Sequence, residues 1–142
     1  MAFNITEFSA GLASGGARNS LFQVEIQNPI NGIADLSVPL LCKAASIPPS
    51  TLTPIEVAHF GRKVKLAGNR TYAQWDVTIF NDEDFAIRNA LEEWTNSINS
   101  FEGNLRKTGS SSPTLYKSQA QVTHFAKDGT ALRIYQFIGL FP

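Results

Sequence analysis

The stretch that decides the fold covers residues 47–82 and reads IPPSTLTPIEVAHFGRKVKLAGNRTYAQWDVTIFND. Its prolines predict a stiff, extended chain over residues 47–54, because proline fixes its own backbone and restricts the residue before it. Residues 55–66 then read as two strand-like pieces that break near residues 60–61. A further strand is predicted over residues 72–80, since apolar and polar side chains alternate there. The apolar face of that strand carries Trp75, Val77 and Ile79.

A helix is predicted directly after this stretch, over about residues 82–100. Asn81 or Asp82 can cap it, and acidic residues in its first turn favour the positive end of a helix. Gly103 is a natural stop. Four apolar residues at spacings of four, three and four form one stripe on this helix: Ile87, Leu91, Trp94 and Ile98.

Two more strands are predicted on the N-terminal side. Residues 21–27 alternate between apolar and polar side chains, which is typical of a half-buried strand. A second strand is expected over residues 36–45, where Pro39 favours a sheet edge or a bulge. The twenty residues before these strands are small and polar, and they read as an arm or loop.

The C-terminal side predicts a flexible loop at residues 108–113 and then two strands, at about 115–125 and 130–138. Between the strands, Lys127-Asp128-Gly129 favours a tight hairpin turn. The predicted fold is therefore mainly β, a β-sandwich or barrel with one packed helix. We expect an arm or loop at residues 1–20 and a single domain at residues 21–142.

Composition points to assembly rather than to nucleic-acid binding. Charged residues make up 17% of the 142-residue chain, against about 25% in a typical soluble domain. Charge is depleted where surface is buried against partner subunits. The formal net charge is zero, which argues against binding that depends on counterion release from phosphates. The single Cys42 forms no internal disulfide, and no signal peptide, membrane-spanning run or membrane anchor is predicted.

No pattern of residues predicts catalysis. The two histidines, His59 and His124, stand in no metal-ligand spacing, and no nucleophile-elbow sequence surrounds a serine. Glu92 and Glu93 are adjacent on the predicted helix, so they point in different directions and form no acid–base pair. We expect no enzyme activity, no catalytic residue, no metal and no cofactor.

Opposite charges are segregated along the chain. Four basic residues crowd into nine positions without an acid among them: Arg62, Lys63, Lys65 and Arg70. Acidic residues then gather at the predicted helix: Asp82, Glu83 and Asp84, followed by Glu92 and Glu93. This pattern suits head-to-tail pairing of identical subunits. Two ordinary solvated faces, or pairing within one chain, explain the spacing equally simply, since surface charges often contribute little.

The outward faces of the predicted strands are mostly polar and uncharged. They carry Gln23, Glu25 and Gln27; Gln74, Asp76 and Thr78; and Gln119, Gln121 and Thr123. Such a face would line a wide wet channel without gripping what passes through it. An ordinary solvent-facing sheet has the same pattern. The candidate channel-facing positions are those of the first and third sets.

Several of these elements stand in a recognisable order. They are Ile47-Pro48, Pro54-Ile55-Glu56-Val57, Phe60-Gly61-Arg62-Lys63-Val64-Lys65, Ala67-Gly68-Asn69-Arg70-Thr71-Tyr72, Trp75-Asp76-Val77-Thr78-Ile79 and Asn81-Asp82. The chain resembles the tail tube proteins of contractile-tailed bacteriophages and their relatives in contractile injection systems. The resemblance covers about residues 19–142, with Asn19-Ser20-Leu21-Phe22-Gln23-Val24, Tyr116-Lys117 and Gly139-Leu140-Phe141-Pro142 as outer matches, and residues 61–82 are its most specific part.

The resemblance implies a structural subunit of the virion that is assembled in the host cytoplasm. It implies six-membered rings that stack into a hollow tube inside a contractile sheath, with DNA passing through the lumen without specific binding. The implied partners are further copies of the chain, the sheath protein, the baseplate and the tail terminator. It also implies that residues 46–72 reach toward neighbouring subunits, which favours the charge-pairing hypothesis.

The chain departs from the family in one respect and leaves two alternatives open. Family members continue past the Gly-Leu-aromatic-Pro element with a further β segment, so we expect the usual C-terminal segment to be missing or shortened here. One alternative is a related tube protein: a baseplate initiator, a terminator or a type VI secretion ring protein. The other, of a different class, is a monomeric β-sandwich binding module.

Overall fold

The computed structural model describes residues 4–12, 16–32, 35 and 38–142. These residues form two compact units, Met1–Leu40 with Asn81–Pro142 as unit 1, and Leu41–Phe80 as unit 2. All pairs of described strands are antiparallel, in one three-stranded and two two-stranded sheets. The mainly-β prediction is confirmed. Closure of these sheets into a sandwich or barrel stays a prediction.

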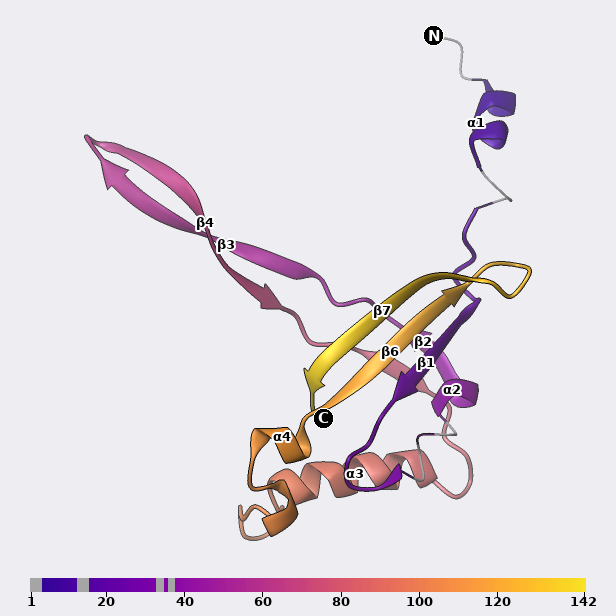
Figure 1. Ribbon diagram of the computed structural model, residues 1–142, viewed down its shortest axis with the longest axis vertical. Coiled ribbons are helices and arrows are strands. Elements are labelled where there is room, and N and C mark those ends of the chain that lie inside the picture. The colour runs from indigo at the N-terminus through magenta and orange to yellow at the C-terminus, as the bar shows by residue number, and fades with distance from the viewer. Residues whose placement is uncertain (1–3, 13–15, 33–34, 36–37) are drawn as a thin grey trace. The chain divides into compact units, whose positions relative to one another are not determined.

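Unit 1 is built on a sheet of three strands in the order β1-β6-β7 (Figure 1). The strands are β1 (Phe22–Ile26), β6 (Ser118–Phe125) and β7 (Ala131–Leu140). The predicted turn joins β6 to β7, and Gly129 has the positive φ of 85° that glycine readily adopts. The Asp128 carboxylate accepts hydrogen bonds from the hydroxyl and the backbone N–H of Thr130. Both lower the pKa of Asp128, and the hydroxyl has the larger effect.

Helix α3 (Ala86–Ile98) supplies the other half of the core. Its predicted apolar stripe is confirmed, because Ile87 and Trp94 are buried and Leu91 and Ile98 are half-buried. Trp94 is fully buried, and its Nε1 donates a 2.8 Å hydrogen bond to the Tyr116 carbonyl. The buried apolar residues of the described chain are Val24, Val38, Ile87, Ala90, Trp94, Ala120 and Val122.

The predicted capping of this helix is wrong. The Asp82 side chain accepts a hydrogen bond from the Glu83 N–H at 2.8 Å. Its carbonyl accepts one from the Phe85 N–H at 3.0 Å, which closes a turn before the helix starts. Phe85 therefore occupies the cap position, with φ 49° and no side-chain cap. Neither Asn81 nor Asp82 caps the helix, which begins four residues later than predicted.

Two short helices replace parts of predicted strands. Helix α2 (Val38–Leu41) precedes strand β2 (Cys42–Ala45), so the strand expected over residues 36–45 is correct only in its second half. Pro39 lies in the first turn of α2, where a helix tolerates proline. Residues 36–37 lie outside the described chain. Helix α4 (Pro113–Tyr116) likewise delays the start of β6.

The segment predicted as a flexible loop at residues 108–113 is fixed to α3. It contains a 3₁₀ turn, η3 (Thr108–Ser110), whose last residue is fully buried. The Ser110 hydroxyl donates to the Ser97 hydroxyl oxygen at 3.0 Å, and Ser97 donates to the Trp94 carbonyl at 2.7 Å. Because buried hydroxyls need partners, this chain of hydrogen bonds holds the segment in place.

Unit 2 contains two strand pairs. β2 pairs with β5 (Val77–Ile79), and β3 (Ser50–His59) pairs with β4 (Arg62–Tyr72). The strand expected over residues 72–80 is thus shorter than predicted. Its apolar face exists, but Trp75, Val77 and Ile79 are half-buried rather than part of the buried core.

The N-terminal arm contains helix α1 (Ile5–Gly11), which sequence reasoning did not predict. The side chain of Asn4 accepts a hydrogen bond from the Thr6 N–H at 3.0 Å and so caps it. No residue of α1 is buried.

Gly68 lies where the pairing of β3 with β4 shifts register, between Leu52 and Pro54. A Cβ at this position would clash with the carbonyl oxygen of Thr53. We therefore expect Gly68→Ala to destabilise the hairpin by about 1–3 kcal/mol, as overpacking does. Faster amide hydrogen exchange across residues 50–72 would report this opening. Gly109→Ala is the control, because nothing stands within 4 Å of its added Cβ. Unchanged exchange in Gly68→Ala would contradict the prediction.

Candidate subunit interface

Strands β3 and β4 form a long two-stranded hairpin with a two-residue turn. His59 pairs with Arg62, so Phe60 and Gly61 make the turn, with φ of 45° and 74°. Both strands are exposed on almost every residue. The break predicted near residues 60–61 is thus confirmed as the tip of this hairpin.

The predicted basic cluster lies on strand β4. Arg62, Lys63, Lys65 and Arg70 are all exposed. Lys63 Nζ lies 3.0 Å from Glu56 Oε2 on the facing strand, so this lysine pairs within its own hairpin. In the described parts of the chain, no ion pair engages the other three basic side chains. They are therefore free to attract an acidic partner.

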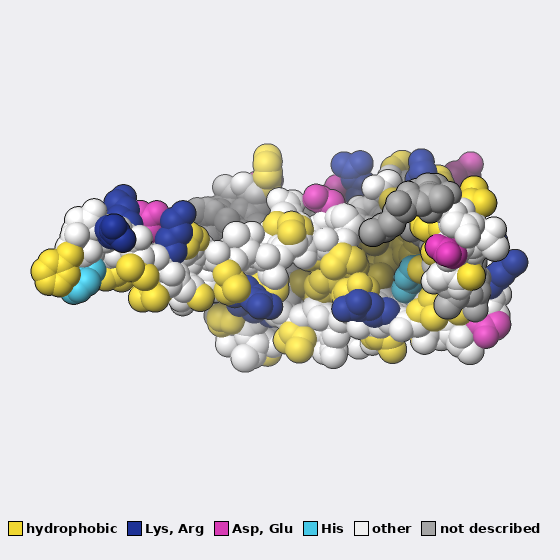
Figure 2. Space-filling model, turned by 90° about the horizontal axis from the view of Figure 1, so that it is seen from above, with side chains coloured by type: hydrophobic (Ala, Val, Ile, Leu, Met, Phe, Trp, Pro, Cys, Tyr) yellow, Lys and Arg dark blue, Asp and Glu magenta, His cyan; other side chains and the backbone are white. Residues whose placement is uncertain are grey.

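The hairpin also carries an apolar face that the sequence analysis did not identify. Ile55 pairs with Leu66 and Val57 pairs with Val64, which places these four side chains on one side of the hairpin. Each is 45–53% exposed. Figure 2 shows hydrophobic and basic side chains exposed along this hairpin. In each strand, apolar residues stand two positions apart, Ile55 with Val57 and Val64 with Leu66. This spacing is the sequence signal that would have indicated the apolar face.

The acidic residues belong to unit 1, whereas the basic cluster belongs to unit 2. Asp82, Glu83 and Asp84 form an exposed turn before α3, which we call the acidic turn. The two helical acids have partners of their own. Glu92 pairs with Arg88 at 2.8 Å, and Glu93 accepts a hydrogen bond from Asn31 at 3.0 Å. The pairing of the basic cluster with the acidic turn stays a prediction.

The polar positions of β1 and β6 lie on one face of the three-stranded sheet. Gln23 faces Thr123 and Glu25 faces Gln121, and Gln119 donates a 3.0 Å hydrogen bond to Gln27. We call this the amide face. Thr123 is buried, so it adds little to the exposed part of this face.

Strand β7 extends the amide face with residues that the sequence analysis did not name. Gln136 donates a 3.5 Å hydrogen bond to Gln119, and the regular register places Ile134 and Ile138 on the same side. Both isoleucines are exposed. The face is therefore amide-rich over β1 and β6 and partly apolar at β7.

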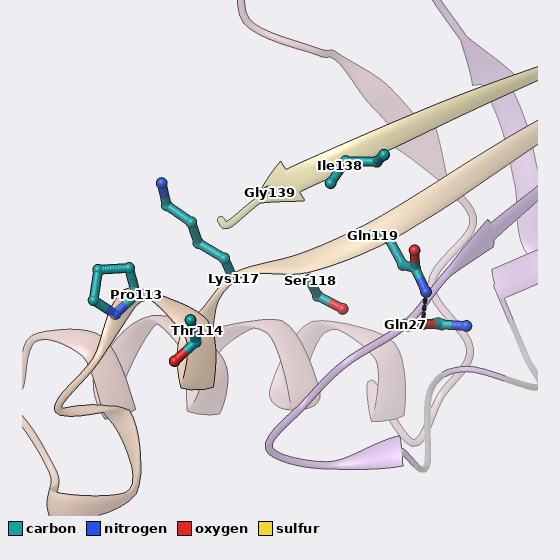
Figure 3. A pocket seen from close by; sticks show the side chains of 8 residues that line it. All are labelled: Gln27, Pro113, Thr114, Lys117, Ser118, Gln119, Ile138 and Gly139. Carbon is teal, nitrogen blue, oxygen red and sulfur yellow. Dashed lines mark hydrogen bonds between the residues drawn. The ribbon is translucent and has the colours of Figure 1, made fainter.

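A shallow recess of about 460 Å³ lies where the amide face ends (Figure 3). It is lined by Gln27, Pro113, Thr114, Lys117, Ser118, Gln119, Ile138 and Gly139. Amides, hydroxyls and one ammonium group surround it, without a carboxylate or imidazole to transfer a proton. This lining is suited to polar contacts.

The remaining chemistry-bearing residues have structural contacts. His124 Nε2 lies 2.6 Å from the Arg18 carbonyl, and the His59 ring stands edge-on to Phe60 with centroids 4.4 Å apart. Partial burial raises the pKa of the Cys42 thiol, which disfavours the reactive thiolate. The described residues contain no group of three or more potential ligands placed to hold a metal. Over the same residues, no helix is long and apolar enough to cross a membrane.

Comparison with known proteins gives consistent matches. A family model described as "Phage tail tube protein" matches residues 8–142. Tail tube protein gp19 of Enterobacteria phage T4 is 35% identical over 127 residues, which cover 89% of this chain and 73% of gp19. Tail tube protein gp19 of Enterobacteria phage T6 matches with the same identity and coverage.

Proposed function

This chain belongs to the phage tail tube protein family, and we propose that it builds the tube as hexameric rings that stack into a hollow conduit for DNA. It is a structural protein of a contractile phage tail and a component of the virion. The family is structural, which agrees with the expectation that the chain is not an enzyme. Tail tube proteins self-assemble and associate with other tail components. The sheath, baseplate and terminator are the proposed partners.

The observation that carries this proposal is the amount of surface that a lone subunit leaves uncovered. The apolar face of the β3–β4 hairpin is about half-exposed. Charged residues, which would keep a lone subunit's surface hydrated, make up only 17% of the chain. Strands β1 and β7 are the outer strands of their sheet, and an unpaired edge invites another strand. Closed rings of identical subunits would bury both kinds of surface.

We propose that the amide face lines the channel. Of its positions on β1 and β6, Glu25 alone is charged, and the amides of Gln27, Gln119 and Gln136 bond to one another. A surface of mutually bonded amides offers DNA phosphates no fixed cations, so DNA would slide without being held. A density map of the assembled tube with these side chains turned away from the channel would contradict this assignment.

We further propose that stacking brings the basic cluster of one subunit to the acidic turn of another. Arg62, Lys65 and Arg70 support this, since they are exposed and make no ion pair in the described chain. Opposed charges would also fix the direction in which rings stack, because the reverse arrangement places like charges together.

Sedimentation of the purified chain over a range of concentrations tests the proposal. Growth from a single species into large assemblies as concentration rises is the expected result. A strict monomer at every concentration would favour the monomeric binding module. Discrete single rings that never stack would favour a baseplate initiator, a terminator or a secretion-system ring protein.

A further inference from the structure

Phe60 holds a backbone conformation that bulky residues rarely adopt. It is the first of the two turn residues at the hairpin tip, and its φ is 45°. Two-residue turns with positive φ at both positions strongly prefer Asn-Gly or Asp-Gly. A bulky residue in the left-handed region is an outlier, and such strain clusters where it serves a function. The turn alone would be better made with asparagine.

The phenylalanine ring does not contribute to the core either. Phe60 is 93% exposed. Its described ring contact is with His59, which is itself exposed at the same tip. Exposed aromatic residues of this kind are enriched at the anchor positions of protein interfaces. The ring is therefore available to a partner outside the single subunit.

We propose that Phe60 anchors a contact between two copies of this chain, with its ring buried against the acidic turn and Phe85 of the second copy. This inference rests on the proposed function and adds the residue that carries the contact. The anchor is followed directly by the basic cluster, which would face the three carboxylates of Asp82, Glu83 and Asp84. This charge complementarity selects a second copy as the occupant.

Phe85 supplies the apolar part of the receiving surface. It follows the acidic turn directly, is 45% exposed and also has a positive φ, of 49°. Two phenylalanines are thus held in the left-handed region, one beside each charged cluster. An edge-on or offset contact between two aromatic rings adds to the affinity that burial of their area provides.

Phe60→Asn separates this role from folding, because asparagine tolerates the left-handed turn. We expect the variant to unfold at the same temperature as the wild type or at a higher one. The concentration needed for assembly should rise about tenfold or more, the usual consequence of losing an interface anchor. The control is Phe101→Asn, since Phe101 is 95% exposed without a positive φ. Phe60→Asn assembly at the wild-type concentration would overturn the inference.

Cross-linking tests which part of the second copy Phe60 contacts. In a Cys42→Ser background, a Phe60→Cys chain is mixed with a Phe85→Cys chain and treated with a short bis-maleimide during assembly. Two rings in contact can hold their Cβ atoms further apart than the roughly 4.5 Å that a disulfide spans, and the bis-maleimide bridges this gap, so a hetero-dimer on a gel is the expected product. Equal cross-linking of Phe60→Cys to Phe101→Cys, or no cross-link in chains that assemble, overturns this inference and leaves the proposed function standing. A wild-type chain that never assembles overturns both.

Discussion

Replacing Trp94 by alanine is expected to lower the free energy of unfolding by about 3–5 kcal/mol, the range for Trp→Ala in protein cores. The side chain is fully buried and is the largest in the described core. Its loss leaves a cavity in the core of unit 1. It also removes the 2.8 Å hydrogen bond to the part-buried Tyr116 carbonyl, and the loss of this donor adds to the cost. Urea denaturation monitored by far-UV circular dichroism, which reports backbone structure and not tryptophan fluorescence, measures the effect.

Two further variants help to interpret the loss of unfolding free energy in Trp94→Ala. Trp94→Phe keeps most of the apolar volume but loses the indole N–H, so it isolates the contribution of the hydrogen bond. Phe101→Ala truncates a ring that is almost wholly exposed and should change stability by no more than about 0.5 kcal/mol. A Trp94→Ala variant that loses less than about 1 kcal/mol would mean that this residue is not the centre of the core.

Reversing Lys63 and Lys65 to glutamate is expected to raise the concentration needed for tube growth by about tenfold or more, with the subunit still folded. Removing exposed charges usually has small effects. Charge reversal is expected to have a larger effect, because the proposed stacking would place the new acids against the acidic turn of the next subunit, and like charges at an interface cost several kcal/mol. Sedimentation measures the growth, and circular dichroism confirms the fold.

The double reversal also removes the Lys63–Glu56 ion pair within the hairpin. Glutamates at positions 63 and 65 would both stand close to Glu56, which lies 3.0 Å from Lys63 and faces Lys65 across the hairpin in the wild type. Glu56→Gln therefore serves as a control that removes this pair alone. Lys107→Glu/Lys127→Glu changes the net charge equally at exposed positions elsewhere.

Restoration by a charge swap is the strongest form of this test. Adding Asp82→Lys and Asp84→Lys to the reversed hairpin should restore growth, because the opposite signs are again opposed. Tube growth of the Lys63→Glu/Lys65→Glu variant at the same concentration as the wild type would contradict the charge-pairing proposal.

The parts of the fold that follow from local sequence pattern were predictable. Alternation in residues 21–27 predicts β1, and the 3.6-residue period of Ile87, Leu91 and Trp94 predicts the buried face of α3. The Asp128-Gly129 turn follows from the conformational freedom of glycine. In each case the physical cause lies within a few residues of the pattern.

The misses depend on contacts between distant residues or on local competition. Ser110 is buried only because Ser97 and Trp94 hold it, and a Thr-Gly-Ser-Ser-Ser run carries no sign of that contact. Phe85 occupies the N-cap position of α3, because the Asp82 side chain accepts its hydrogen bond from Glu83 within the preceding turn. The basic cluster was found by its charges. The alternate spacing of Ile55 with Val57 and of Val64 with Leu66 indicated an apolar face on each strand, but only the strand register shows that the two faces lie on the same side of the hairpin.

Electron microscopy of the purified chain tests the central claim most directly. A tube subunit that buries its hairpin and its sheet edges against other copies should form hollow tubes of stacked rings, with sixfold symmetry in end-on views. Particles that remain single subunits, in a sample whose circular dichroism shows the folded protein, would contradict the account.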